Sequence, residues 1–289
     1  MKFTSSIGYI LFFAVFFTAC KEEVKVEKKS TPKEKRETEK NYTTRIQKAF
    51  AEIIDTSNLE GSVLLFDFQK EKYYSNDFEW AKTERLPAST FKIPNTIIAL
   101  ETGVMSSDTS VFIWDGKPRR LKVWEKDMTL GEAFDVSCVP CYQEVARSIG
   151  YDRMKQYLNR FNYGDMDVTK QTIDKFWLEG NSKISQYQQI DFIERFYHDG
   201  LGISENTSTI MKKIMVIEET DHYVFAGKTG WAIRNNTDNG WFVGYIELDQ
   251  KVYFFAVNVT PKDGFDMDNF AEYRVNIAKK ALSEAGLMK

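Results

Sequence analysis

Apolar side chains recur along the chain with spacings that predict helices in its first and middle parts. Residues 44–54 place Ile46, Phe50 and Ile53 on one face, which predicts an amphipathic helix. From Ser89 to about residue 206 the spacing is again helical and strand signals are few. The middle of the chain is therefore predicted to be mostly helical.

Strand signals lie on both sides of this helical middle. Segments with strand composition cover residues 62–68, 72–75, 223–227, 241–248 and 252–259, and a helix over about 269–285 follows them. Strands so far apart in sequence pair non-locally, so we expect an α+β fold, an α/β sandwich. Its antiparallel sheet is flanked by helices and joined to a mostly helical lobe. A functional site is expected where sheet and lobe meet.

The composition agrees with one large folded domain. Of 289 residues, 43% are hydrophobic and 15% aromatic, which is enough for a sizeable core. The net charge of −3 gives no reason to expect nucleic acid as a partner.

The N-terminal residues predict export instead of folding. Residues 1–19 have a positive start and a short apolar core, and they end just before Cys20 in the manner of a bacterial lipoprotein signal. Residues 20–42 are nearly all polar or charged, which predicts a disordered tether, although a solvated helix is an alternative. The expected product is a catalytic domain over residues 43–289, held by lipidated Cys20 on the periplasmic face of a membrane. Because Phe17 is bulky for a lipoprotein signal, a soluble periplasmic protein is the alternative.

A Ser-x-x-Lys motif, Ser89 to Lys92, opens the first helix of the central region. At this spacing the hydroxyl and the amine share one face, and the unpaired N–H groups of a first turn favour an alkoxide. The motif predicts a nucleophile and its base. A cap serine followed by an exposed lysine is the alternative, and the spacing by itself does not decide between them.

A second motif, Lys228-Thr229-Gly230, ends the predicted strand over residues 223–227. Its lysine and threonine offer a charge and a hydroxyl to a carboxylate, and its glycine allows close approach of a substrate backbone. The two motifs in this order match the serine β-lactamases and penicillin-binding proteins.

Further segments narrow the resemblance. They are Ser137-Cys138-Val139, Tyr142-Gln143, Tyr163-Gly164-Asp165, Lys175-Phe176-Trp177-Leu178-Glu179-Gly180 and Gly240-Trp241-Phe242-Val243-Gly244. With them the chain closely resembles the class D serine β-lactamases from about Glu60 to its C-terminus, so a β-lactamase/transpeptidase-like fold is expected. The class A Ser-Asp-Asn triplet is absent from the sequence. Asp165 departs from the usual asparagine, which leaves the role of its loop open.

The resemblance implies a role for Lys92. A lysine buried among apolar side chains loses its charge, and its free amine can capture carbon dioxide. In this family the lysine carries such an N-carboxylate, which serves as the general base, and no other cofactor is implied. By position, Trp177 would hold the carboxylate, while Val139 and Leu178 would keep the pocket apolar. Simple core packing is the alternative role for Trp177.

The other roles are carried over in the same way. Ser137 and Lys228 would pass a proton to the leaving lactam nitrogen, and the backbone N–H groups of Ser89 and Trp231 would form the oxyanion hole. The substrate carboxylate would bind at Thr229, Gly230 and Arg274. For Arg274, a helix-surface arginine paired with Glu272 is the alternative.

The cysteines and histidines predict no metal site and no Ser-His-Asp triad. Cys138 and Cys141 form one C-x-x-C without a second pair, which we interpret as two buried thiols in preference to a local disulfide. His198 and His222 have no motif partner, so both are expected to be structural or exposed.

The expected function is hydrolysis of the lactam amide of penicillin-type antibiotics through an acyl-serine. A penicillin sensor or a transpeptidase, which acylates without fast hydrolysis, is the alternative. Against the sensor, the sequence carries neither a string of membrane helices nor an H-E-x-x-H motif. Substrate range depends on loops such as residues 231–239 and on the surroundings of Trp114 and Trp124, whose shape the sequence does not fix.

Overall fold

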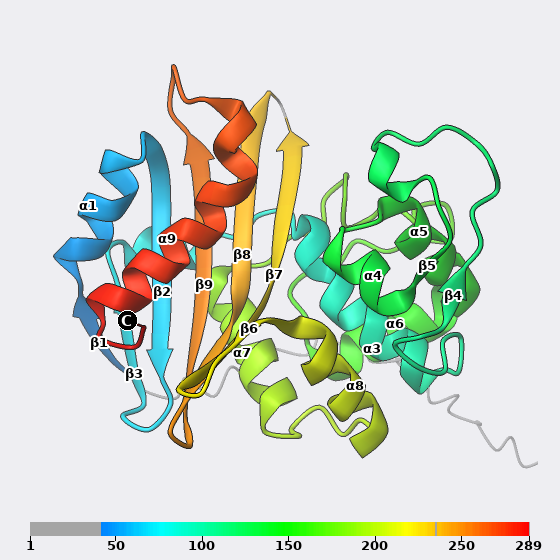
Figure 1. Ribbon diagram of the computed structural model, residues 1–289, viewed down its shortest axis with the longest axis horizontal. Helices are drawn as coiled ribbons and strands as arrows, with labels where there is room; N and C mark the ends of the chain where they lie inside the picture. Colours follow the sequence, from blue (N-terminus) through cyan, green and yellow to red (C-terminus); the bar gives the residue numbers. More distant parts are fainter. Residues whose placement is uncertain (1–41, 235, 289) are drawn as a thin grey trace, which may run out of the picture. The chain divides into compact units, whose positions relative to one another are not determined.

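The computed structural model describes residues 42–234 and 236–288, and its central element is a seven-stranded sheet (Figure 1). Its strand order is β1-β3-β2-β9-β8-β7-β6. The strands are β1 Thr43–Ile46, β2 Leu59–Asp67, β3 Lys72–Ser75, β6 Val216–Glu219, β7 Tyr223–Arg234, β8 Thr237–Leu248 and β9 Lys251–Pro261. The predicted signal, Cys20 and all but the last residue of the predicted tether lie outside the described residues.

The helices cover the sheet and build the lobe beside it. The α-helices are α1 Lys48–Thr56, α2 Phe78–Lys82, α3 Lys92–Glu101, α4 Leu130–Asp135, α5 Val139–Ile149, α6 Tyr151–Phe161, α7 Gln186–Tyr197, α8 Glu205–Met215 and α9 Phe270–Glu284. The 3₁₀ turns are η1 Ala88–Phe91, η2 Lys122–Trp124 and η3 Met267–Asn269, and a small sheet pairs β4 Val111–Phe112 with β5 Met128–Thr129. In the part of the chain that the structure describes, no helix is long and apolar enough to cross a membrane.

The sheet closes by pairing the two ends of the domain, as the sequence predicts. Strand β2 lies antiparallel to β9, with Leu59 opposite Pro261 and Asp67 opposite Tyr253. The long strands β7, β8 and β9 form a continuous antiparallel meander on the other side. The α+β prediction is therefore confirmed, with the helical lobe beside the sheet (Figure 1).

Two details of the prediction are wrong at the N-terminal edge of the sheet. Residues Thr43–Ile46 form a strand parallel to β3, so the sheet is mixed and helix α1 starts only at Lys48. Ile46 is 55% exposed and so does not belong to the apolar face of the helix. The β-branched run Thr-Thr-Arg-Ile finds ladder partners at the sheet edge, and this pairing overrides the helical spacing.

Alternate side chains of the sheet face two separate cores. On β2, Val63 and Leu65 pack with Phe50 of α1 and Ile277 of α9, whereas Leu64 and Phe66 face the core shared with α7 and the lobe. Figure 1 shows α9 crossing one face of the sheet. The period-2 pattern of the strands thus fixes which face meets the lobe.

The hairpin between β7 and β8 is longer than the sequence predicts. Residues 231–239, expected as a loop, are strand except near the turn, with Trp231 opposite Gly240 and Arg234 opposite Thr237. The predicted strand over residues 223–227 ends directly before the Lys-Thr-Gly motif, and glycine is poor in strand interiors. In the fold, Gly227 lies where an added Cβ would be 2.6 Å from the Val243 carbonyl oxygen, so close packing explains the residue.

Candidate active site

The Ser-x-x-Lys pair lies at the junction of the lobe and the sheet. Ser89 belongs to the 3₁₀ turn η1, and Lys92 is the first residue of α3. The Lys92 Nζ donates a hydrogen bond of 2.9 Å to the Ser89 Oγ. Ser89 is 8% exposed, whereas Lys92 is fully buried. The predicted pairing of hydroxyl and amine is present, and the alternative of an exposed lysine is wrong.

Backbone contacts hold the Ser89 turn in place. Ala88 adopts a left-handed conformation with a φ of 51°, and its N–H donates to the Trp177 carbonyl oxygen at 2.9 Å. The Thr90 hydroxyl donates to the Pro87 carbonyl oxygen and accepts from the Gln189 amide. A non-glycine residue at positive φ costs free energy, so its presence beside a nucleophile indicates a position set by function.

The surroundings of Lys92, taken together, disfavour its charged form. Burial is the largest cause that brings the pKa of Lys92 well below its ordinary value, and the charge of Lys228 adds to the effect. The Tyr142 ring acts in the opposite direction, because its centre lies 5.1 Å from the Lys92 Nζ and the face of an aromatic ring attracts a cation. The lowered pKa favours the neutral amine, which is the form that acts as a base or accepts carbon dioxide.

Trp177 packs behind the Ser89 turn with an unsatisfied polar atom. Its indole is fully buried, is stacked on Phe91 with ring centres 5.2 Å apart, and meets Phe176 edge-on. The Trp177 Nε1 finds no hydrogen-bond acceptor among the described residues. Val139 and Leu178 are half-buried and pack against the same core. A buried N–H without an acceptor is costly, so an acceptor is expected at this point.

Ser137 and Lys228 form the second polar pair. The Lys228 Nζ donates to the Ser137 Oγ at 2.5 Å, and the ring of Phe134 lies 5.4 Å away. Burial lowers the pKa of Lys228 to about 7, with a smaller contribution from the charge of Arg274. A lysine with this pKa can both give and take a proton near neutral pH.

The Lys-Thr-Gly motif lies inside strand β7, not at its end as predicted. Gly230 faces the Ser89 turn, where an added Cβ would lie 3.0 Å from the Pro87 carbonyl oxygen and 3.2 Å from the Thr90 backbone nitrogen. The glycine therefore lets strand β7 approach the nucleophile turn closely.

Arg274 is buried in helix α9, so the surface-arginine alternative is wrong. It is 5% exposed and donates to the carbonyl oxygens of Phe270, Ala271 and Gly230. Its guanidinium lies 5.6 Å from the centre of the Trp231 ring, whose Nε1 donates to Asp238. Burial lowers the pKa of Arg274 to about 10, which still leaves it a cation at neutral pH.

The two internal cysteines form a disulfide, so the prediction of free thiols is wrong. Cys138 caps helix α5 and is bonded to Cys141 in its first turn. This turn brings the two Cα atoms to 5.4 Å, a separation that a disulfide spans. A C-x-x-C spacing is compatible with two free thiols and with a disulfide, so the sequence alone does not decide between them.

The two histidines and Asp165 belong to neither the Ser89–Lys92 pair nor the Ser137–Lys228 pair. His198 ends helix α7 and stacks on Phe68 at 4.2 Å, and His222 is exposed before β7. Asp165 is bridged to Lys183 through backbone hydrogen bonds in both directions, and its side chain is 67% exposed. Aspartate in place of asparagine therefore leaves this backbone pairing intact.

Some functional positions have no clear signal in the sequence. Phe134 places its ring near Lys228, and Gln189 reaches Thr90 from helix α7. Their apolar or helical spacing indicates only burial. The left-handed conformations of Ala88 and Ser137 also could not be predicted, since neither is a residue type that favours positive φ.

Comparisons with known proteins agree with this geometry. Residues 54–283 match the family of the penicillin binding protein transpeptidase domain. The chain is 40% identical over 235 residues to β-lactamase OXA-10 of Pseudomonas aeruginosa, an alignment that covers 80% of this chain and 86% of the relative. It is 42% identical over 200 residues to OXA-48 of Klebsiella pneumoniae, covering 69% and 75%.

A solved structure gives the same result at the level of the fold. A class D β-lactamase from Nostoc superimposes with a TM-score of 0.79 and 38% identity, covering 83% of this chain and 99% of that one. Together with the Ser89–Lys92 and Ser137–Lys228 pairs, these similarities show that the chain belongs to the class D serine β-lactamases.

Proposed function

We propose that this β-lactamase opens the lactam ring of penicillin-type antibiotics with Ser89 and then hydrolyses the resulting ester. The observation that supports the proposal is the 2.9 Å hydrogen bond between the Ser89 hydroxyl and a fully buried Lys92 whose pKa is lowered by burial. A nucleophile and a base within hydrogen-bond reach are the geometry that nucleophilic catalysis requires.

Acylation follows from the two polar pairs. The base at position 92 takes the proton of the Ser89 Oγ, which attacks the lactam carbonyl carbon, and the carbon–nitrogen bond breaks. The ring nitrogen takes a proton from the Ser137 Oγ, which recovers one from the Lys228 Nζ at 2.5 Å. With its pKa near 7, Lys228 can supply this proton and regain it.

Deacylation uses the same base on a water molecule. Before this step the base releases to solvent the proton that it took from the Ser89 Oγ, and Lys228 regains one from solvent. The water then gives one proton to the base and adds as hydroxide to the ester carbonyl, the bond from carbon to the Ser89 Oγ breaks, and the base returns its proton to the serine. The new carboxylic acid gives its own proton to solvent. One water is consumed and the opened penicillin leaves with a new carboxylate. The backbone N–H groups of Ser89 and Trp231 are proposed to hold the carbonyl oxygen during both steps.

We further propose that Lys92 is carboxylated by carbon dioxide. A neutral amine is the reactive form, and the unpaired Nε1 of Trp177 is a buried donor that a carboxylate would satisfy. Val139 and Leu178 would keep the surroundings apolar. Carboxylation would supply a stronger hydrogen-bond acceptor and an oxygen base at position 92.

Substrate binding is assigned to strand β7 and helix α9. The Thr229 hydroxyl and the Arg274 guanidinium are proposed to bind the substrate carboxylate, with Gly230 keeping the strand close to Ser89. Burial makes Arg274 a favourable partner, because it is already desolvated and fixed by backbone carbonyls.

The place of action is proposed from residues 1–42. Export through the signal over residues 1–19, followed by lipidation of Cys20, would hold the domain on the periplasmic side of a membrane, where β-lactams arrive. A soluble periplasmic enzyme is the alternative.

Turnover of a chromogenic cephalosporin tests the activity. Purified enzyme is mixed with excess substrate and the absorbance change is followed. We expect many turnovers per enzyme molecule, and none with Ser89→Ala. A single burst equal to the enzyme concentration would show an acylating sensor or transpeptidase instead.

A further inference from the structure

The Cys138–Cys141 disulfide lies inside the catalytic segment, between residues that contact the two lysines. Ser137, which precedes it, accepts the hydrogen bond from Lys228, and Tyr142, which follows it, places its ring over Lys92. Cys138 is 1% exposed and Cys141 is 9% exposed. The bond therefore closes the turn that joins two parts of the active site.

The backbone at Ser137 needs outside support. Ser137 has a φ of 52°, a left-handed conformation that a serine rarely adopts. It connects the end of helix α4 to the start of helix α5, and its N–H reaches the Phe134 carbonyl oxygen at 3.2 Å. The Ser137 Oγ can meet Lys228 only while this junction keeps its conformation.

Contacts on both sides of Ser137 supply that support. On one side the Trp124 Nε1 donates to the Val136 carbonyl oxygen at 3.0 Å. On the other side the Cys138 N–H donates to the Ala133 carbonyl oxygen at 2.8 Å, and the Cys138 sulfur accepts from the Cys141 N–H. The disulfide ties this second anchor covalently to helix α5.

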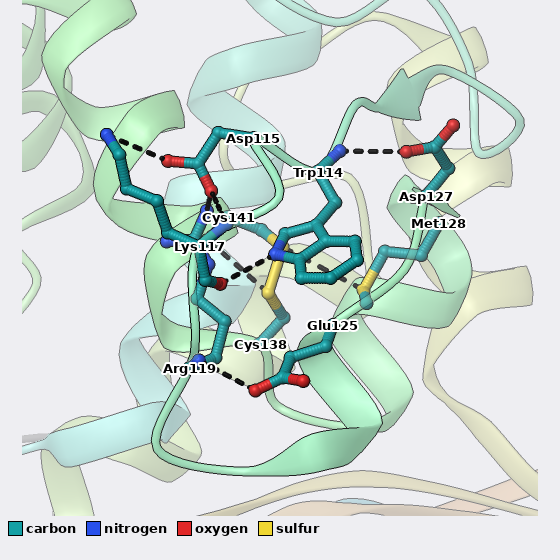
Figure 2. Close-up of polar contacts among 9 residues, drawn as sticks. All are labelled: Trp114, Asp115, Lys117, Arg119, Glu125, Asp127, Met128, Cys138 and Cys141. Carbon is teal, nitrogen blue, oxygen red and sulfur yellow. Dashed lines mark hydrogen bonds and ion pairs between the residues drawn. A yellow bond between two sulfur atoms is a disulfide. The ribbon is translucent and has the colours of Figure 1, made fainter.

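The disulfide also contacts strand β5, which directly follows the loop over residues 114–127. Figure 2 shows the Cys141 sulfur facing Met128, at a sulfur–sulfur distance of 3.8 Å. The neighbouring Asp127 carboxylate accepts from the Trp114 N–H at 2.8 Å, which closes the loop between them. The same covalent bond thus lies against both the Ser137 junction and the base of this loop.

We propose that the Cys138–Cys141 disulfide is a positioning element for Ser137, so that breaking the bond slows β-lactam acylation without removing any group that touches substrate. This inference rests on the proposed relay role of Ser137. Without the bond, Cys138 remains a helix cap but is no longer joined to the first turn of α5, and the left-handed junction relaxes. The Ser137 Oγ then spends less time beside Lys228.

A relaxed junction also changes the surroundings of Lys228. Burial is the main cause of its lowered pKa, with Arg274 of α9 lowering it further and Asp135 of α4 raising it, and Lys92 of α3 interacts with it as a second amine. Looser packing at α4 and α5 admits water, so the pKa of Lys228 moves upward. A merely structural loss of stability would lower the amount of active enzyme without this shift.

The test compares acylation rates with and without the bond. Single-turnover acylation by a fluorescent penicillin is measured across pH in wild type and in Cys138→Ser/Cys141→Ala, in which serine keeps the cap acceptor. Rates come from the time course of the labelled fraction, so inactive protein does not contribute. Pro140→Ala, in the same turn with the disulfide intact, is the matched control.

Reduction of wild type provides an independent route to the same state. A trialkylphosphine gives two electrons to the disulfide and takes up the oxygen of water, whose protons complete two thiols. Mass spectrometry after thiol alkylation counts the molecules that have been reduced. The double variant cannot respond to the phosphine, so it reports any direct effect of the reagent.

We expect acylation to slow about 10-fold in the double variant and equally in reduced wild type. This is less than the roughly 10²-fold that a fixed 1 Å misplacement can cost, because the Ser137 Oγ still spends part of its time beside Lys228. The apparent pKa of the profile should move upward, and Pro140→Ala should match wild type. Equal rates, or slower rates with an unchanged pH profile, would overturn the positioning role. If Ser137→Ala with its disulfide intact acylates like wild type, the relay itself is wrong, which is a separate failure.

Discussion

Replacing Trp177 by phenylalanine separates the indole N–H from the packing of the ring. The Trp177 Nε1 is buried without an acceptor, while the ring is stacked on Phe91. A hydrogen bond to a charged group contributes about 1.5–3 kcal/mol. At 1.36 kcal/mol for each tenfold change, Trp177→Phe should lower the equilibrium constant for carboxylation of Lys92 by roughly 10- to 150-fold.

Carbon-13 NMR with labelled bicarbonate measures this constant directly. The carbamate signal is followed against bicarbonate concentration in both proteins, and hydrolysis is measured in the same samples. Trp241→Phe is the matched control, because it removes another buried indole N–H, one that already donates to the Leu86 carbonyl oxygen at 2.9 Å. Equal bicarbonate midpoints for wild type and Trp177→Phe would refute the reasoning.

Three further predictions address other parts of the chain. Lys228 has a pKa of about 7 in the folded state and a higher one in the unfolded chain, so wild type becomes more stable as pH rises from about 7 to about 10. Urea unfolding should therefore show that the stability deficit of wild type relative to Lys228→Met shrinks over this range, whereas a constant difference would contradict the prediction. Gly230→Ala should lose about 1–3 kcal/mol of stability in the same assay, because its Cβ would press on the Pro87 carbonyl oxygen, whereas unchanged stability would mean that strand and turn separate freely. Cys20→Ser should move the protein from the membrane fraction to the soluble periplasm on fractionation; a wild type that is already soluble would rule out the lipid anchor.

The fold could be predicted from sequence wherever the periodicity was strong. Strand signals on both sides of the helical middle predicted the non-local closure, which the pairing of β2 with β9 confirms. The edge strand β1 was missed, since its pairing with β3 depends on a partner that local pattern does not reveal. The predicted strand ended at Gly227, whereas β7 continues to Arg234, with Gly227 and Gly230 both closely packed inside it.

The main residues of the candidate site could be predicted from motifs, but their burial and backbone conformation could not. Ser-x-x-Lys and Lys-Thr-Gly gave Ser89, Lys92 and Lys228 through the family resemblance. The depth of burial that lowers the pKa of Lys92 and the left-handed turn at Ser137 arise from tertiary packing. The disulfide was not predicted because a C-x-x-C spacing is the same for two free thiols and for a bonded pair.

The role of Lys92 beside Ser89 is tested most directly by rapid-quench peptide mass spectrometry with benzylpenicillin. In wild type we expect a transient adduct on the peptide that contains Ser89, which disappears as penicillin is hydrolysed. In Lys92→Ala the adduct should form slowly on the same serine and then persist, because the base that serves both steps is gone. An adduct on another residue, or Lys92→Ala turning over like wild type, would contradict the mechanism.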